Sequence, residues 1–392
     1  MRWIYAKTPE ELAHRREKIA LARAWWKEFE KRADDLNQLF AGKQDWDLPK
    51  WIAETLQRID CGLMWEFGPA INGPGHRLVI TPESESELRP LVCSILENAP
   101  DIPGWEFYGH RLPEPPVTAL AMVKARQGAA ITGWRCVACS SGAKIDLYYL
   151  PSEQINDGAL FDGYAFVLTE SLLGEAVLDQ WIGVICAISE VDLHKETRGE
   201  GEIVELAEFK AHVDKLIEAR RDSLPDKPLV VEVNDEAQGR VYQYKPEKAD
   251  DYDQQEDLLT GIGIVDGLAS AVRRPGFYSS SFSRRGEVFC YLKTDGSDIA
   301  PEDSFEDRAS IEDAIDAAIR PEFLGCVIGG GTGLRYSYVE LALTDVEQAA
   351  ERINNALRDG GISRRSWLLF HDCELCAEWI GVYDDSPPPP GF

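Results

Sequence analysis

Apolar side chains recur at helical spacing near the start of the chain, and this recurrence predicts a long helix from Pro9 to about Phe40. Leu12 and Trp26 fall on the face that is expected to pack, while charged residues occupy the positions between them. A second helix is predicted from Leu48 to Ile59. We therefore expect a helical N-terminal section over residues 1–60.

The pattern then changes to short apolar runs bounded by glycine and proline, which is typical of strands. Two strands flank the loop 71–75, a helix begins near Ser84 or Ser86, and another strand begins at Trp105. Further on we expect a hairpin over 135–151, a strand over 163–171, a helix with or without a following strand over 171–188, and an amphipathic helix over 204–221. These elements form a first module over residues 61–222.

The last part of the chain repeats this order. A strand over 286–292 precedes residues 323–372, which follow the order strand, glycine turn, strand, helix, strand. Asp345 is expected to cap that helix and Gly360-Gly361 to end it. Trp-Ile-Gly-Val also occurs twice, at Trp181–Val184 and at Trp379–Val382. The repeated order predicts an internal duplication, with a second module over residues 223–392.

Mixed strands and helices joined by hairpins predict an α+β fold. The expected architecture is two related ferredoxin-like modules, each an antiparallel or mixed sheet with helices on one face, plus the N-terminal helical section.

Four glycines within residues 329–333 raise the question of a phosphate-binding loop. Such a loop needs a Lys-Ser/Thr pair after the glycines and then a helix, whose N-terminal N–H groups hold the anion. Here the glycines run instead into Tyr336 and Tyr338, which share one face of a predicted strand. Gly329 to Gly333 are therefore predicted to turn a hairpin, with backbone contact to a ligand as the alternative.

Two Cys-x-x-Cys pairs, Cys136/Cys139 and Cys373/Cys376, call for a metal test, and His371 precedes the second pair. Tetrahedral zinc needs four converging ligands, but the two pairs lie in different predicted modules, and the pair Cys136/Cys139 lacks the usual turn glycine or proline. Core cysteines are the favoured interpretation, and Cys373, Cys376 and His371 stay the metal candidates. No nucleophile motif or carboxylate pair stands out, so we name no catalytic residue and expect no cofactor.

Charge narrows the class of partner. The chain has 68 acidic and 41 basic residues, which gives a formal net charge of −27. Such a charge repels nucleic acid and anionic lipid, and it favours a basic protein partner or simply solubility. No apolar run is long enough to span a membrane, no secretory signal is visible, and nine scattered cysteines fit a reducing cytoplasm.

The segment HRLVITPESESELRPLVCSILENAPDIPGWEFYGHR, residues 76–111, carries a resemblance. It resembles a bacterial protein family of unknown function, in which a strand, an acidic helix start and a Pro-Gly-Trp turn recur. The resemblance extends over residues 63–190. It implies no catalytic residues.

These observations favour a non-enzymatic binding or regulatory protein of the immunity or inhibitor type, acting through an acidic surface on a basic protein. The alternative is an enzyme for a small molecule, with a cleft between the modules. The residues expected to line such a cleft or an interface are Trp181, Trp379, Tyr336 and Tyr338. A structural subunit with a self-complementary apolar patch is a third possibility. The sequence names neither the oligomeric state nor a role for the tail Pro387–Pro390.

Overall fold

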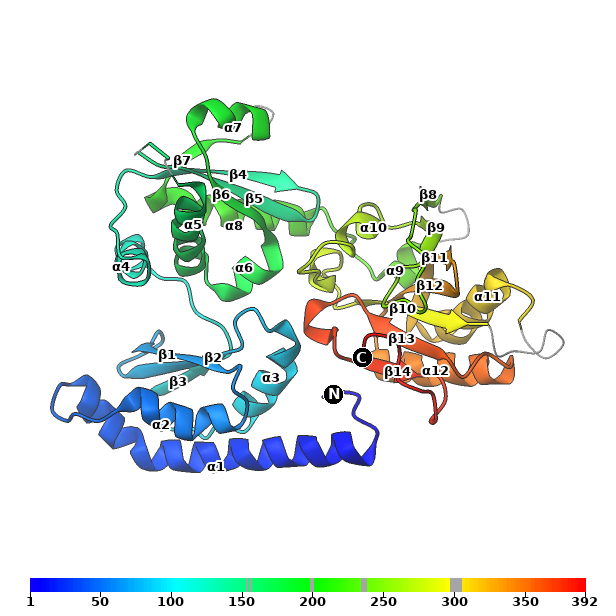
Figure 1. Ribbon diagram of the computed structural model, residues 1–392, viewed down its shortest axis with the longest axis horizontal. Helices are drawn as coiled ribbons and strands as arrows, with labels where there is room; N and C mark the ends of the chain where they lie inside the picture. Colours follow the sequence, from blue (N-terminus) through cyan, green and yellow to red (C-terminus); the bar gives the residue numbers. More distant parts are fainter. Residues whose placement is uncertain (153, 156, 198–200, 234–237, 297–304) are drawn as a thin grey trace. The chain divides into compact units, whose positions relative to one another are not determined.

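The computed structural model describes residues 1–392 except 153, 156, 198–200, 234–237 and 297–304 (Figure 1). The described residues form two compact units. The first holds Met1–Val137 and Leu147–Lys210, and the second holds Ala138–Asp146 and Ala211–Phe392. The structure has no separate unit over residues 1–60, because the N-terminal helices share a core with the strands that follow them. The second unit takes up the chain at Ala211, before the predicted limit at residue 222.

The first unit begins with α1 (Pro9–Phe40), as predicted. Thr8 caps it: the Glu11 N–H donates to Thr8 Oγ1 at 3.2 Å, and the Thr8 N–H donates to the Glu11 carboxylate at 3.0 Å. The predicted second helix is shorter, since α2 (Leu48–Glu54) gives way to a 3₁₀ turn at Leu56–Arg58. Tryptophan dominates the contact between these helices and the sheet, as Trp25, Trp26 and Trp105 are all buried in one cluster.

A three-stranded sheet packs on α1 in the order β1-β2-β3. Strand β1 (Met64–Pro69) pairs antiparallel with β2 (His76–Thr81), and β2 pairs parallel with β3 (Trp105–Tyr108) through the crossover helix α3 (Arg89–Glu97). A 3₁₀ turn at Ser86–Leu88 leads into α3, close to the predicted helix start.

A four-stranded sheet follows in the order β6-β5-β4-β7. The remaining elements up to residue 222 are α4 (Pro116–Gln127), β4 (Arg135–Ser141), β5 (Lys144–Leu150), α5 (Gly158–Leu173), α6 (Glu175–Trp181), β6 (Ile182–Ala187), α7 (Glu190–Glu196), β7 (Ile203–Glu205) and α8 (Leu206–Asp222).

The strand predicted over residues 163–171 is wrong, because these residues lie in α5. Every residue from Val167 to Leu173 is buried. This C-terminal part of α5 is enclosed and shows no polar stripe, so its apolar run looks like that of a buried strand. Asp157 fixes its start by accepting a hydrogen bond from the Leu160 N–H at 3.2 Å.

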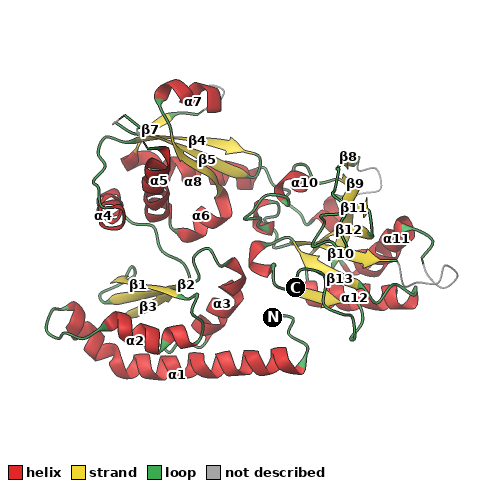
Figure 2. Cartoon of the chain, viewed as in Figure 1, coloured by secondary structure: helices red, strands yellow, loops and turns green. Residues whose placement is uncertain are grey.

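The second unit is built on a seven-stranded sheet in the order β14-β13-β10-β12-β11-β9-β8. Its elements are α9 (Leu229–Glu232), β8 (Arg240–Gln243), β9 (Leu258–Gly263), α10 (Leu268–Ala271), β10 (Val288–Asp295), α11 (Arg308–Ile319), β11 (Gly325–Gly333), β12 (Tyr336–Leu343), α12 (Val346–Asp359), β13 (Ser366–Phe370) and β14 (Trp379–Gly381), with 3₁₀ turns at Ser279–Ser281, Arg320–Glu322 and Cys373–Leu375. Helices α11 and α12 lie together on one face of this sheet (Figure 2).

The chain in this unit follows the order β10, α11, β11, β12, α12, β13, and the four strands pair antiparallel in the order β13-β10-β12-β11. In the first unit β2 and β3 are direct neighbours, whereas β10 separates β12 from β13 in the second. As predicted, Asp345 caps α12 and the helix ends at Gly360. The whole is an α+β fold with antiparallel and mixed sheets.

The predicted glycine turn is wrong in its position. Gly329 to Gly333 lie within β11, and the chain reverses at Leu334-Arg335. Asp257 holds this reversal, since its carboxylate accepts from the backbone N–H groups of Arg335 at 2.7 Å and Tyr336 at 2.9 Å. A carboxylate thus fixes the turn that glycine was expected to make.

None of the helices that the structure describes is long and apolar enough to cross a membrane.

Candidate binding site

Helices α11 and α12 cover one face of the seven-stranded sheet, and α9 and α10 pack on part of the other. Residues of β12 alternate, so Tyr338 and Glu340 point to one face and Val339 to the other. A Cβ at Gly330, which pairs with Val339, would lie 2.4 Å from the Glu312 carboxylate of α11. Helices α11 and α12 therefore cover the Val339 face, and Glu340 points away from these two helices.

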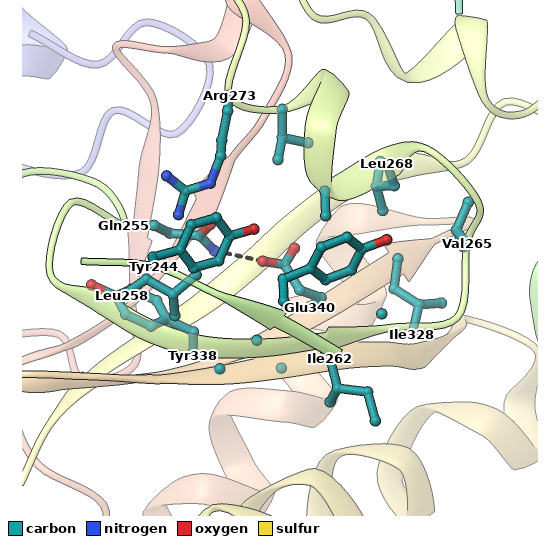
Figure 3. Close-up of a pocket in the computed structure, with 17 residues that line it drawn as sticks. Tyr244, Gln255, Leu258, Ile262, Val265, Leu268, Arg273, Ile328, Tyr338 and Glu340 are labelled. Carbon is teal, nitrogen blue, oxygen red and sulfur yellow. Dashed lines mark hydrogen bonds between the residues drawn. The ribbon is translucent and has the colours of Figure 1, made fainter. Parts of the chain in front are cut away.

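The Glu340 face carries a pocket (Figure 3), and the empty space there, counted together with the open solvent at its mouth, is about 510 Å³. Five aliphatic side chains line it: Leu258, Val265, Leu268, Val272 and Ile328. Tyr242, Tyr244 and Tyr338 add aromatic surface. The pocket is therefore suited to an apolar body with flat faces.

Glycines from two paired strands make room for the pocket. Gly261 and Gly263 of β9 line it beside Gly330 and Gly331 of β11, and Gly261 pairs with Gly331. An added Cβ at Gly263 would meet no atom within 4 Å, so open space begins directly above the backbone there. The glycine run, which raised the question of a phosphate-binding loop, lies inside the sheet instead, where its lack of side chains leaves space for the pocket.

Glu340 is the carboxylate of this pocket, and two side chains hold it. Gln255 Nε2 donates to Glu340 Oε1 at 2.5 Å, and His371 Nε2 lies 2.7 Å from Glu340 Oε2. The His371 ring packs against Tyr291, with ring centroids 4.8 Å apart. Burial raises the pKa of Tyr291 well above its usual value, and the charge of Glu340 adds to the effect.

A second, more polar pocket adjoins the first, and the empty space there, counted together with the open solvent at its mouth, is about 950 Å³. The two pockets share Gln255, Val272 and Arg273, and the second is lined in addition by Arg274 and His371. The Arg273 guanidinium lies 3.6 Å from the centroid of the Tyr244 ring, so the aromatic face holds it between the two pockets (Figure 3).

The metal candidates of the sequence do come together here, because His371, Cys373 and Cys376 all line the second pocket. However, the described part of the chain contains no group of three or more His, Cys, Asp or Glu residues arranged to hold a metal ion. The metal interpretation therefore gains no support from the geometry.

The four aromatic residues expected at a cleft or interface are all buried, with exposed fractions of 8% or less. Tyr338 lines the apolar pocket, and its hydroxyl donates to Asp257. Tyr336 donates to Asp251 at 2.6 Å. Trp181 ends α6 in the first unit and Trp379 begins β14 in the second, where it joins the cluster of Tyr336 and Tyr338.

Lys293 lies fully buried in that aromatic cluster. Its ammonium is 4.2 Å from the centroid of the Tyr336 ring, and it donates to the backbone carbonyl of Tyr252. Burial lowers its pKa to about 8, although nearby acidic groups, Asp257 first among them, act in the opposite direction. With no exposed surface, Lys293 serves packing rather than chemistry on a ligand.

The first unit contains a buried ion network. Arg89 donates to Glu175 at 2.8 Å, the Arg111 N–H donates to the same carboxylate at 2.9 Å, and Arg111 also donates to Glu170 at 2.9 Å. Burial works to raise the pKa of Glu175, but the hydrogen bond from Thr81 and the charge of Arg89 lower it below its usual value. The ion pairs of Arg89 with Glu175 and Asp179 fix α3 against α6, although the buried Nε atoms of Arg89 and Arg111 make no hydrogen bond.

Sequence reasoning missed Gln255, Arg273 and Glu340. One signal for Glu340 was present, since strand alternation places it on the same face as Tyr336 and Tyr338, where an isolated carboxylate is unusual. Another was the Arg273-Arg274 pair in a strongly acidic chain.

Comparison with protein-family models, with curated proteins and with solved structures found no match for this chain. The family resemblance over residues 63–190 therefore stays a prediction.

Proposed function

We propose that this is a non-enzymatic binding or regulatory protein of the bacterial cytoplasm, of the immunity or inhibitor type, which holds a basic protein through an acidic surface. The observation that carries the proposal is the excess of 68 acidic over 41 basic residues. A field of this sign steers a basic partner toward the chain and speeds association.

One acidic segment is well placed to make the contact. Asp250, Asp253 and Glu256 are exposed, while Tyr252 and Asp257 between and beside them are buried. The buried anchors fix the backbone, so the carboxylates are displayed without the ordering cost of a loose tail. None of the ion pairs among the described residues uses the side chains of Asp250, Asp253 or Glu256.

The test is isolation of the tagged chain from its own host at physiological salt, with native mass spectrometry of what accompanies it. We expect a stoichiometric basic protein, and we expect its affinity for the triple variant D250N/D253N/E256Q to fall at least about tenfold, with a smaller dependence on salt.

The matched control removes three exposed carboxylates from α1 in E17Q/E30Q/D34N, which changes the net charge by the same amount. Equal losses in both triples would show that total charge acts and not this segment. Recovery of no basic partner at all would refute the proposed function.

We also propose that β10 to β13 with α11 and α12 form a ferredoxin-like module. The antiparallel order β13-β10-β12-β11 supports it, because a β-α-β-β-α-β chain forms that order in such modules. Duplication is a separate proposal. It is supported by Trp-Ile-Gly-Val, which precedes or begins a strand in both units.

A second candidate function is an enzyme for a small molecule, now with its pocket inside the second unit. The pair Glu340 and His371 favours it, because a carboxylate that orients an imidazole is a common arrangement for general bases. Turnover of a substrate by the wild type and its loss in E340Q, with binding retained, would support this candidate over the first.

A further inference from the structure

We propose that the two adjoining pockets of the second unit form one binding site for a small amphiphilic carboxylate, which has a flat apolar body and a single anionic group. The site borders the acidic segment that was proposed to bind a protein, since Glu256 lines the second pocket, but the proposal does not rest on that function. The apolar body would occupy the pocket above the glycines, and the carboxylate would lie on the Arg273 side, where the second pocket begins.

The residues that line the first pocket indicate the apolar part of the ligand. Leu268, Val272 and Ile328 face the ring of Tyr244 across a pocket that the glycines of β9 and β11 leave open. The open position at Gly263 is decisive, since space above a strand backbone can accept a ring at van der Waals distance. Only apolar contact is available over most of this surface, so a fully polar ligand would leave its hydrogen bonds unmade.

Two arginines, Arg273 and Arg274, indicate the anionic part of the ligand. Among the described residues, the side chains of Arg273 and Arg274 make no ion pair, although the chain carries 68 acidic residues. Tyr244 fixes the plane of the Arg273 guanidinium, and a fixed guanidinium binds a carboxylate through two parallel hydrogen bonds.

The surroundings decide the sign and the size of the ligand charge. A cationic ligand would meet Arg273 and Arg274 at the junction of the pockets. A dianion would be repelled by Glu256 and Glu340, which line the second and the first pocket. A single carboxylate satisfies both conditions, and Glu340 can still accept a hydrogen bond from a hydroxyl or amide on the ligand.

The experiment is isothermal titration of the full-length chain with naphthoate, and with naphthamide as the neutral probe of the same shape. We expect naphthoate to bind, naphthamide to bind at least about tenfold more weakly, and R273Q to lower naphthoate affinity by a similar factor without changing that for naphthamide. The control R16Q removes an exposed arginine of α1 and should leave both affinities unchanged.

A second pair of variants tests the position of the body. G263L fills the open space above β9, and G73L adds the same side chain at another glycine with no atom within 4 Å of its Cβ. We expect G263L to abolish naphthoate binding and G73L to have no effect, with folding of each checked by circular dichroism. If G263L fails to fold, G263A replaces it, with a several-fold loss expected.

Absence of naphthoate binding to the wild type would overturn the proposal, as would equal binding of naphthoate and naphthamide or full binding by R273Q. The proposed protein partner could fail its own test without affecting these results, because the variants and probes are different.

Discussion

Gly329 and Gly263 pair with each other across β11 and β9, yet the structure predicts opposite effects when each is changed to alanine. Gly329 has φ of +155° and its added Cβ would lie 2.2 Å from the Ile262 carbonyl oxygen. Gly263 has no atom within 4 Å of an added Cβ. The fold therefore requires glycine at position 329, whereas the glycine at position 263 only leaves space above the strand.

The cost of Gly329→Ala has two parts. Backbone strain for a side chain in this region of φ costs about 1–3 kcal/mol. The close approach to the Ile262 carbonyl must also be relieved by moving two strands, which costs about 1–3 kcal/mol more, as in other overpacked cores. Together the two parts predict a loss of about 2–6 kcal/mol in the free energy of unfolding. Gly263→Ala should gain roughly 0.5–1 kcal/mol, because alanine loses less backbone entropy in a strand.

Urea unfolding monitored by hydrogen exchange of peptides from β12 measures this difference in the second unit alone. The m value should stay constant while the midpoint falls for Gly329→Ala and rises slightly for Gly263→Ala. If the two variants unfolded at the same urea concentration, the close strand approach at Gly329 would not exist as described, and the inference that glycines of β9 and β11 leave space for the pocket would lose its basis.

Three further predictions concern buried charge. Glu11 has its pKa lowered to about 2 from 4.5, because its hydrogen bonds to Arg2, Lys7 and Thr8 outweigh burial. Its stabilising effect is therefore complete above about pH 4.5 and lost as the pH falls through about 2, so urea unfolding should show E11Q less stable than wild type by up to about 3 kcal/mol at pH 7 and by about half as much at pH 3. R89M leaves the Glu175 carboxylate buried without its main partner, and we expect a loss of about 3–5 kcal/mol in thermal or urea unfolding, partly recovered in R89M/E175Q. Lys293 has its pKa lowered to about 8 from 10.5, so between these pH values the unfolded chain binds a proton that the folded chain does not. As the pH rises from about 8 to 10.5, the free energy of unfolding of the wild type should increase by up to about 3 kcal/mol relative to that of K293M. Parallel pH profiles of the two proteins would contradict this.

The parts of the fold that could be predicted from sequence are those that local physics decides. Pro9 and the helical spacing of apolar residues place α1, and Asp345 and Gly360 bound α12, because capping involves only neighbours in the chain. The strand predicted over 163–171 failed for the opposite reason. Burial of every residue from Val167 to Leu173 comes from distant elements, and it removes the polar stripe by which a helix is recognised.

The candidate site lay beyond prediction because its parts meet only in the folded sheet. Glu340 reaches His371 from a different strand and Gln255 from a loop more than eighty residues earlier. The metal candidates illustrate the same limit. Their types and spacing were visible in the sequence, but whether enough ligands converge on one point is a property of the fold.

The glycine run shows how one distant residue changes the meaning of a motif. Read alone, Gly329 to Gly333 suit a turn, since glycine is the residue that turns most often require. In the structure Asp257 accepts the N–H groups of Arg335 and Tyr336 and holds the reversal after the glycines have ended. The glycines are then free to lie inside β11, where Gly329 permits close strand approach and Gly331 faces Gly261. The carboxylate of Asp257 therefore supports the turn beside the pocket, and D257N should weaken the turn and disturb ligand binding together.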